Sequence, residues 1–310
     1  MKNKPIIIVP GEINSIFFEI FFKILKKRSF KSPLILISST KIYKAQAKKF
    51  KFKKKVKFIT FDKLKNSEID NKSLNLFNIT NSKNYLENSF DTAFKILKSG
   101  FTNKFINGPV DKTNFLRRKY LGMTEYISKK FKTKNTAMLI FNKDLSVCPL
   151  TTHLPLKLVT KNISKKLIFQ KTSLINKFYL QNIGIKPKIA VTGLNPHCES
   201  ILKFNEDKKI LSPAINSLKK IGINIDGPFS ADTIFLKQNR KKYDVILGMY
   251  HDQVLTPLKT LKEYDAINIT LGLPFLRVSP DHGPNKKMIN KNLSNPLSLL
   301  QSIKFLDKLC

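Results

Sequence analysis

Histidine is rare in this chain of 310 residues, and its four copies stand in similar places. His153 follows "VCPLTT", His197 follows "IAVTGLNP" and His251 follows "DVILGMY", whereas His282 lies in "SPDHG", after "AINITLGLPFLR". Each preceding run is apolar and strand-like. In open α/β sheets, ligands bind in the crevice outside the carboxyl ends of the strands. The sequence therefore predicts that several of these side chains meet at one edge of a sheet.

Three neutral imidazoles, those of His153, His197 and His251, could hold a divalent cation and leave positions open for a substrate, as catalytic metal sites do. They lie too far apart in the sequence for a local zinc-finger clip. A histidine near a strand end is also commonly a hydrogen-bonded structural residue, and composition and spacing leave both interpretations open. Cys198 could be a fourth ligand, although a small buried thiol is the more usual role.

Other polar residues flank these points. "SADT" is typical of a helix start, with Ser230 as the cap and Asp232 either in the first helical turn or acting as a base near a metal. Lys259 follows His251 by two helical turns and could reach a bound anion. Arg277 lies in an apolar run, where a guanidinium needs a partner. That partner is either an anionic ligand, held in bidentate fashion, or a protein carboxylate.

Short β-rich runs alternate with helical patterns, which predicts an α/β fold around a largely parallel sheet. The predicted strands are 5–9, 33–38, 56–60, 104–108, 137–141, 188–194, 244–250 and 266–272. The predicted helices are 85–98, 163–182, 210–221, 231–238 and 296–308. The Asn-, Lys- and Ser-rich segment 64–84 reads as a loop. No GxGxxG or Walker-type loop is present, so the sequence does not support a Rossmann dinucleotide site.

The net charge of +36 raises the possibility of nucleic-acid binding. Only five of the 57 basic residues are arginine, and the abundance of lysine, asparagine, isoleucine and phenylalanine is explained by A/T-rich codons. The charge remains compatible with a small anionic substrate. Three widely spaced cysteines do not suggest a disulfide framework, and no apolar run is long enough to span a bilayer. We expect a cytoplasmic globular protein of two domains that binds neither membrane nor nucleic acid.

Several motifs together resemble one enzyme family. "TTHLPLK", "VTGLNPH", "GPFSADTIF", "YDVILGMYHDQ" and "INITLGLPFLRVSPDHG" are similar, in order, to the 4-hydroxythreonine-4-phosphate dehydrogenases of pyridoxal phosphate biosynthesis. "PGE", "INGPVDK" and "GMTEYIS" add weaker matches, so the resemblance covers nearly the whole chain. Each motif is modest alone, but the ordered set is specific.

The resemblance implies an isocitrate/isopropylmalate-dehydrogenase-like, non-Rossmann fold with two domains and an active site in the interdomain cleft and at a homodimer interface. Residues 1–122 with 262–310 would form the cofactor-side domain, and 123–261 the domain with the metal ligands and the dimer interface. The family's metal ligands fall on His153, His197 and His251. Its substrate contacts fall on Thr124, Lys259, Asn268 and Arg277, and its cofactor-side loop on Asp281, His282 and Gly283.

The implied reaction is NAD(P)-dependent oxidation of 4-phosphooxy-L-threonine at C3, followed by decarboxylation to 3-amino-2-oxopropyl phosphate. It would use a divalent metal (zinc, magnesium or cobalt) and NAD or NADP. A cation held by three histidines suits this chemistry because it can stabilise negative charge on the substrate oxygen.

The chain departs from the family pattern at several positions. Met123 replaces a histidine that contacts substrate, and a thioether cannot titrate or supply that donor. Val254 replaces a glycine after "HDQ", "CES" replaces the glycines after "NPH", and "INSIFFE" and "PNKKMIN" replace two further family segments. Met123 is the best argument for an alternative: a related metal-dependent dehydrogenase of threonate or erythronate phosphate. A non-catalytic nucleic-acid-binding protein is the remote alternative.

Overall fold

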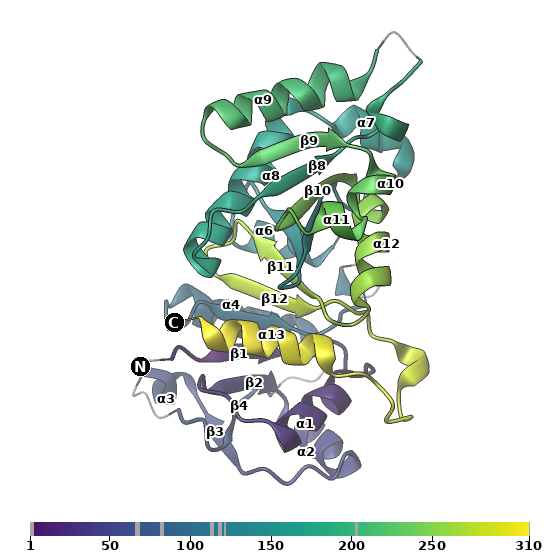
Figure 1. Ribbon diagram of the computed structural model, residues 1–310. Coiled ribbons are helices and arrows are strands. Elements are labelled where there is room, and N and C mark those ends of the chain that lie inside the picture. The colour runs from purple at the N-terminus through teal and green to yellow at the C-terminus, as the bar shows by residue number, and fades with distance from the viewer. Residues whose placement is uncertain are drawn as a thin grey trace. The chain divides into compact units, whose positions relative to one another are not determined.

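The computed structural model describes residues 3–65, 69–80, 84–111, 115–116, 120, 122–201 and 204–309. The fold is α/β, as the alternating pattern predicts, and it forms two compact units (Figure 1). Unit 1 comprises Met1–Met123 and Pro274–Cys310, and unit 2 comprises Thr124–Leu273. The chain returns to unit 1 at 273/274, later than the 261/262 boundary that the sequence suggests, because the strand Ile267–Leu271 pairs within unit 2.

A parallel sheet forms the centre of unit 1. Its strands, in spatial order, are β3 (Val56–Ile59), β4 (Leu74–Asn78), β2 (Leu34–Ser38), β1 (Ile6–Val9), β5 (Lys104–Asn107) and β12 (Leu276–Pro280). Its helices are α1 (Phe17–Lys27), α2 (Thr40–Lys49), α3 (Phe61–Lys65), α4 (Tyr85–Lys98) and α13 (Leu297–Lys308). β1 reads "IIIV" and is buried throughout, which is expected of a central parallel strand.

The apolar run near the N-terminus forms the amphipathic helix α1. Its phenylalanines pack inward, and Phe22 stacks on Phe52 with ring centroids 4.3 Å apart. Glu19 lies in the first turn and two lysines lie in the last, which complements the helix dipole. Among the described residues, no helix is both long enough and apolar enough to cross a membrane.

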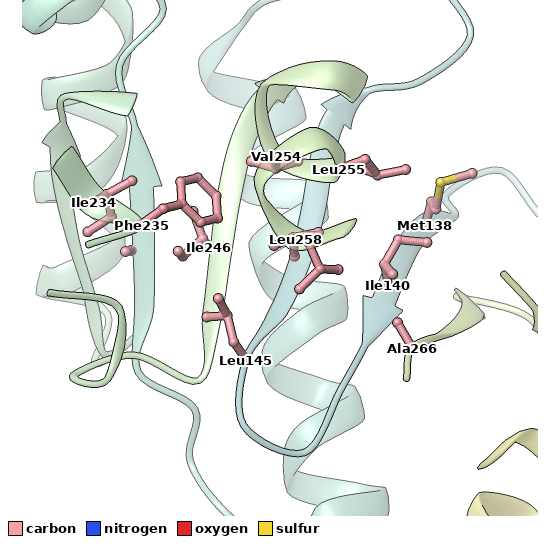
Figure 2. Packing of buried hydrophobic residues seen from close by; sticks show 12 residues of the cluster. Met138, Ile140, Leu145, Ile234, Phe235, Ile246, Val254, Leu255, Leu258 and Ala266 are labelled. Atoms are coloured by element: carbon pink, nitrogen blue, oxygen red, sulfur yellow. The ribbon is translucent and has the colours of Figure 1, made fainter. Parts of the chain in front are cut away.

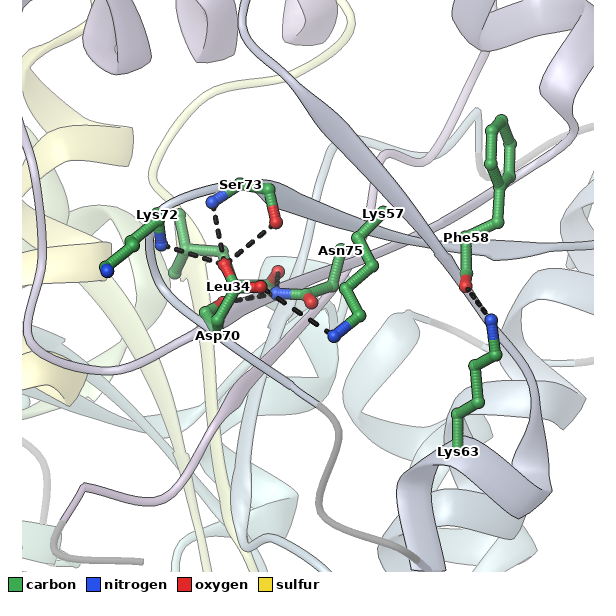
Figure 3. A network of polar contacts seen from close by, with 8 residues as sticks. All are labelled: Leu34, Lys57, Phe58, Lys63, Asp70, Lys72, Ser73 and Asn75. Carbon is green, nitrogen blue, oxygen red and sulfur yellow. Dashed lines mark hydrogen bonds and ion pairs between the residues drawn. The ribbon is translucent and has the colours of Figure 1, made fainter.

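The prediction of a loop over 64–84 is wrong in part, because β4 lies inside this segment. "LNLFN" places Asn75 at a fully buried position, where its Nδ2 donates to the carbonyls of Leu34 (3.1 Å) and Asp70 (2.7 Å). Figure 3 shows these bonds beside the Asp70 carboxylate, which accepts bonds from the turn that leads into β4. A buried amide that is hydrogen-bonded in this way is compatible with a strand. Residues 66–68 and 81–83 of this segment lie outside the described part of the chain.

Unit 2 contains a mixed sheet. In spatial order its strands are β11 (Ile267–Leu271), β6 (Ala137–Phe141), β7 (Ser146–Thr151), β10 (Val245–Tyr250), β8 (Ile189–Thr192) and β9 (Ile225–Phe229). β6 is antiparallel to both β11 and β7, whereas β7, β10, β8 and β9 are mutually parallel. All eight predicted strands are confirmed. The list of predicted strands left out β4, β7, β9 and β12, of which β7, β9 and β12 contain proline, although the run before His153 was read as strand-like.

Helix α12 (His251–Lys262) covers β7 and β10 of unit 2. Its inner face places Val254, Leu255 and Leu258 in a hydrophobic core, which Figure 2 shows. The packing is close: a Cβ at Gly248 of β10 would lie 2.2 Å from Val254 Cγ1. Val254 is therefore accommodated as a fully buried core residue opposite a strand glycine.

The remaining helices of unit 2 differ from the sequence prediction in detail. They are α6 (Met123–Lys130), α7 (Val159–Asn162), α8 (Lys165–Phe178), α9 (Ser212–Lys220), α10 (Ala231–Ile234) and α11 (Lys237–Arg240). The predicted helix 231–238 is two short helices. Ser230 stands at the N-cap of α10, but its side chain makes no capping hydrogen bond. The prediction of Ser230 as the cap is therefore confirmed in its position, but not in a side-chain hydrogen bond.

Candidate active site

The three predicted metal ligands follow three adjacent parallel strands of unit 2. His153 comes two residues after β7, His251 is the first residue of α12 directly after β10, and His197 lies in a 3-10 turn, Pro196–Cys198, after β8. Since β7, β10 and β8 are parallel neighbours, their carboxyl ends meet at the same edge. The predicted arrangement of strand ends is therefore present.

Two of the three histidines are close neighbours. The ring centroids of His153 and His251 lie 6.1 Å apart, with the ring planes at 36°. His251 Nδ1 lies 2.6 Å from Asp252 Oδ1, so its Nε2 is the nitrogen left for a ligand. A carboxylate on the second ring nitrogen is the usual companion of a metal-bound histidine. This pair therefore fits a divalent cation.

His197 is not grouped with that pair. Within the described part of the chain, no cluster of three or more His, Cys, Asp or Glu side chains is arranged to hold a metal ion. His197 is exposed and takes a left-handed backbone conformation (φ 53°, ψ 21°), as does Cys198 (φ 60°). Burial, and then the charge of Asp207, raise the pKa of the Cys198 thiol.

A hydrogen-bond network that the sequence did not reveal ties these strand ends together. Thr151 Oγ1 at the end of β7 donates to the Met249 carbonyl in β10 (2.8 Å). Gln253 Oε1 accepts from the Met249 amide and from Thr192 Oγ1 in β8, both at 2.7 Å. Gln253 Nε2 donates to the Gly193 carbonyl at 2.8 Å. The presence of Gln253 inside the "HDQ" motif was the feature of the sequence that could have indicated this network.

The predicted substrate residues of unit 2 lie on α6, α12 and β11. Thr124 is buried, and its Oγ1 lies 3.4 Å from that of Thr270, which occupies the same face of β11 as Asn268. Asn268 Oδ1 is buried and accepts no hydrogen bond from the described residues. A ligand donor would satisfy that oxygen. Lys259 is exposed on α12, two turns beyond His251.

Arg277 and Met123 are predicted site residues of unit 1, one in a strand and one at the start of a helix. Arg277 in β12 is 3% exposed, and its Nε donates to Asn107 Oδ1 at the end of β5 (2.7 Å). The sequence did not predict this neutral partner, although "INGPVDK" contains it. Met123 is the first residue of α6.

The predicted cofactor-side loop directly follows β12. The Asp281 amide donates to Ser298 Oγ (2.8 Å), and His282 Nδ1 lies 3.0 Å from the Gly283 carbonyl oxygen. Gly283 is exposed, and a Cβ there would meet no atom within 4 Å. Asp232, the candidate base, lies exposed in the first turn of α10.

These features define a class: an α/β protein of two units in which histidines follow the carboxyl ends of parallel strands. The family model "Pyridoxal phosphate biosynthetic protein PdxA" matches residues 23–306, and the chain belongs to this family.

Curated relatives carry one name. The chain is 44% identical over 186 residues to "4-hydroxythreonine-4-phosphate dehydrogenase" of Sulfurihydrogenibium sp., a match that covers 59% of this chain and 57% of the relative. It is 40% identical over 191 residues to the protein of that name in Aquifex aeolicus, covering 61% and 59%. The matched segments thus span less than two thirds of either relative.

Solved structures extend the likeness over the whole fold. A putative 4-hydroxythreonine-4-phosphate dehydrogenase from Salmonella typhimurium superposes with a TM-score of 0.83 at 27% identity, covering 99% of this chain and 100% of that one. A beta-decarboxylating dehydrogenase from Thermococcus kodakarensis superposes with a TM-score of 0.51 at 13% identity, covering 97% and 82%. The second likeness concerns the fold alone.

Proposed function

We propose that this chain catalyses the NAD(P)-dependent oxidation of 4-phosphooxy-L-threonine at C3, followed by decarboxylation to 3-amino-2-oxopropyl phosphate, in pyridoxal 5'-phosphate biosynthesis. Family membership over residues 23–306 carries the proposal. The positions of His153, His197 and His251 support it, because these residues follow three neighbouring parallel strands. We further propose a homodimer that acts in the cytoplasm.

His153 and His251 would hold a divalent cation (zinc, magnesium or cobalt), with His197 as the third ligand. When bound, such a cation supplies positive charge that stabilises negative charge developing on the substrate oxygen. Asp252 would keep the hydrogen of His251 on Nδ1 and fix the ring, because its carboxylate can only accept. The buried Asn268 Oδ1 would orient the substrate by accepting a hydrogen bond.

Lys259 and Arg277 are the proposed partners of the substrate phosphate. Arg277 is held by Asn107 through Nε, an arrangement that constrains the orientation of its guanidinium group. The assignments of Thr124, Asp281, His282 and Gly283 to substrate and cofactor follow from the resemblance and remain predictions, as does a basic role for Asp232.

The test is NAD(P)H formation from 4-phosphooxy-L-threonine, measured with and without a chelator. We expect chelation or His251→Ala to abolish turnover, and metal addition to restore the chelated wild type. Thr256→Ala is the matched control, because Thr256 is exposed on the same helix. Turnover that survives both chelation and His251→Ala would contradict the metal mechanism. Activity confined to threonate or erythronate phosphate would instead reassign the substrate, with Met123 as the residue to revert to histidine.

A further inference from the structure

We infer that Asp207 is a positioning residue of the active site: its buried carboxylate fixes the loop that carries His197. Asp207 is 1% exposed. Its Oδ1 accepts the Leu194 amide at 2.7 Å, and its Oδ2 accepts the Asn195 amide at 3.1 Å and Asn195 Nδ2 at 2.9 Å. Both carboxylate oxygens are thus used by the residues just before Pro196 and His197. The role in metal binding rests on the proposed function.

The chemistry of these contacts requires a carboxylate. All three groups that face Asp207 are N–H donors, and an ionised carboxylate is the side chain that accepts on both of its oxygens. An asparagine in the same position would turn an NH2 group toward at least one of these donors. The hydrogen bonds to an ionised acceptor are also stronger than those to a neutral one.

The loop is packed against Asp207 without spare room. A Cβ at Gly193 would lie 2.6 Å from Cys198 Sγ and 3.0 Å from Asp207 Oδ1. His197 and Cys198 both take positive φ, a conformation that non-glycine residues keep only where the surroundings impose it. Asp207 constrains the residues just before them, Leu194 and Asn195, from the start of the helical segment Asp207–Leu211.

Gln253 connects the same loop to β10, the strand that directly precedes His251. Its Nε2 bonds the Gly193 carbonyl, and its Oε1 bonds the Met249 amide, two residues before His251. Asp207 and Gln253 therefore both bond the first residues of the loop Gly193–Cys198, from two different segments of the chain. Together they set where His197 stands relative to His251, which neither histidine determines by its own contacts.

The experiment compares Asp207→Asn with Asp244→Asn. Asp244 also accepts a backbone amide, that of Lys188 at 2.7 Å, but at the amino ends of β8 and β10. Two quantities are measured in each variant: amide hydrogen exchange of the peptide spanning 193–198, and Co²⁺ affinity by absorbance titration. In Asp207→Asn we expect exchange at least about tenfold faster and Co²⁺ affinity about 10- to 100-fold weaker. Asp244→Asn should leave both within about twofold of wild type, because its bond lies at the far end of the strands.

Equal effects of the two substitutions would overturn the inference, because they would show general destabilisation. The inference would also be overturned if the Asp207→Asn variant kept the amide exchange rate and the Co²⁺ affinity of the wild type. If wild-type protein binds no Co²⁺, the proposed metal site fails, and the exchange rates alone decide whether Asp207 fixes the loop. If Asp207→Asn does not fold, Asn195→Ala replaces it, since this substitution removes one of the three donors. Asp207→Glu, which keeps the charge, should recover part of the Co²⁺ affinity, whereas a charge-independent role would give no recovery.

Discussion

Two aspartates organise turns in this protein, one in each unit, with nearly the same set of contacts. In unit 1, Asp70 Oδ1 accepts the Lys72 amide (2.9 Å), the Ser73 amide (2.8 Å) and Ser73 Oγ (2.8 Å), as Figure 3 shows. In unit 2, Asp207 accepts two amides and one side-chain donor. The Asp70 side chain is 41% exposed, whereas Asp207 is buried.

The two sites differ in how far their donors lie along the chain. The donors of Asp70 come from the next three residues, so this aspartate shapes its own turn, as Asx turns do. The donors of Asp207 lie 12 and 13 residues before it. A contact of that kind forms only once the unit has folded, and its loss leaves buried donors without water. The hydrogen bonds to Asp207 in unit 2 should therefore contribute far more to the free energy of unfolding than those to Asp70 in unit 1.

The largest effect should follow from Asp207→Asn. We expect a loss of about 2–4 kcal/mol in the free energy of unfolding, because a buried carboxylate with three donors is replaced by a group that cannot accept them all. Urea denaturation at pH 7 measures it. Asp70→Asn, measured in parallel, should lose less than about 1 kcal/mol, because water can replace its bonds. Equal losses would remove the distinction between the two turns.

Gln253→Leu tests an uncharged side chain that also forms hydrogen bonds between segments far apart in the sequence. Leucine has a similar size but leaves the Met249 amide and the Gly193 carbonyl without their partner. We expect a loss of about 2 kcal/mol by urea denaturation. The control is Thr192→Val, which removes only one of the bonds to Gln253 and should lose about 1 kcal/mol. A larger loss in the threonine variant would show that Gln253 is not the centre of this network.

The same contrast explains what the sequence could predict. Strands with continuous apolar runs, such as β1 and β10, were visible because burial on both faces leaves a local signal. β4 was missed because "LNLFN" lies in an Asn-, Lys- and Ser-rich segment, and its buried Asn75 is satisfied only through bonds to Leu34 and Asp70. β9 was missed because proline argues against a strand, whereas β7 was recognised only as the strand-like run before His153.

The candidate site also has features that the sequence could predict and features that it could not. The histidines could be placed after their strands from sequence alone, since that placement follows from local pattern. The pairing of His153 with His251 depends on which strands are neighbours, and the loop that carries His197 is held by bonds to Asp207 and Gln253. Such contacts join residues far apart in the sequence, and nothing in their local pattern marks them.

A smaller effect is expected from the pH dependence of the Asp70 turn. The Ser73 amide hydrogen bond, the largest influence, lowers the pKa of Asp70 below its ordinary value of 3.8. A depressed folded-state pKa gives stability that is present above the unfolded pKa and is lost as pH falls through the folded value. The stability difference between wild type and Asp70→Asn should therefore be constant from pH 5 to 7 and shrink below about pH 4. A difference that grows on acidification would contradict this assignment.

The smallest effect should come from the ion pair at the edge of the same turn. Lys57 Nζ lies 3.8 Å from Asp70 Oδ2, and both side chains are partly exposed, at 34% and 41%. We expect Lys57→Gln to lose less than about 0.5 kcal/mol at low salt, and less still at about 1 M salt, where screening is strong.

The control for this ion pair must account for the net charge of +36, because removing any lysine reduces repulsion in the folded state. Lys63→Gln is suitable, since Lys63 donates to the Phe58 carbonyl and lies in the same part of unit 1. The difference between the two variants, measured by urea denaturation across salt concentrations, isolates the pair with Asp70. A difference above about 1 kcal/mol that does not change with salt would show that the exposed turn of unit 1 is held as firmly as the buried one of unit 2.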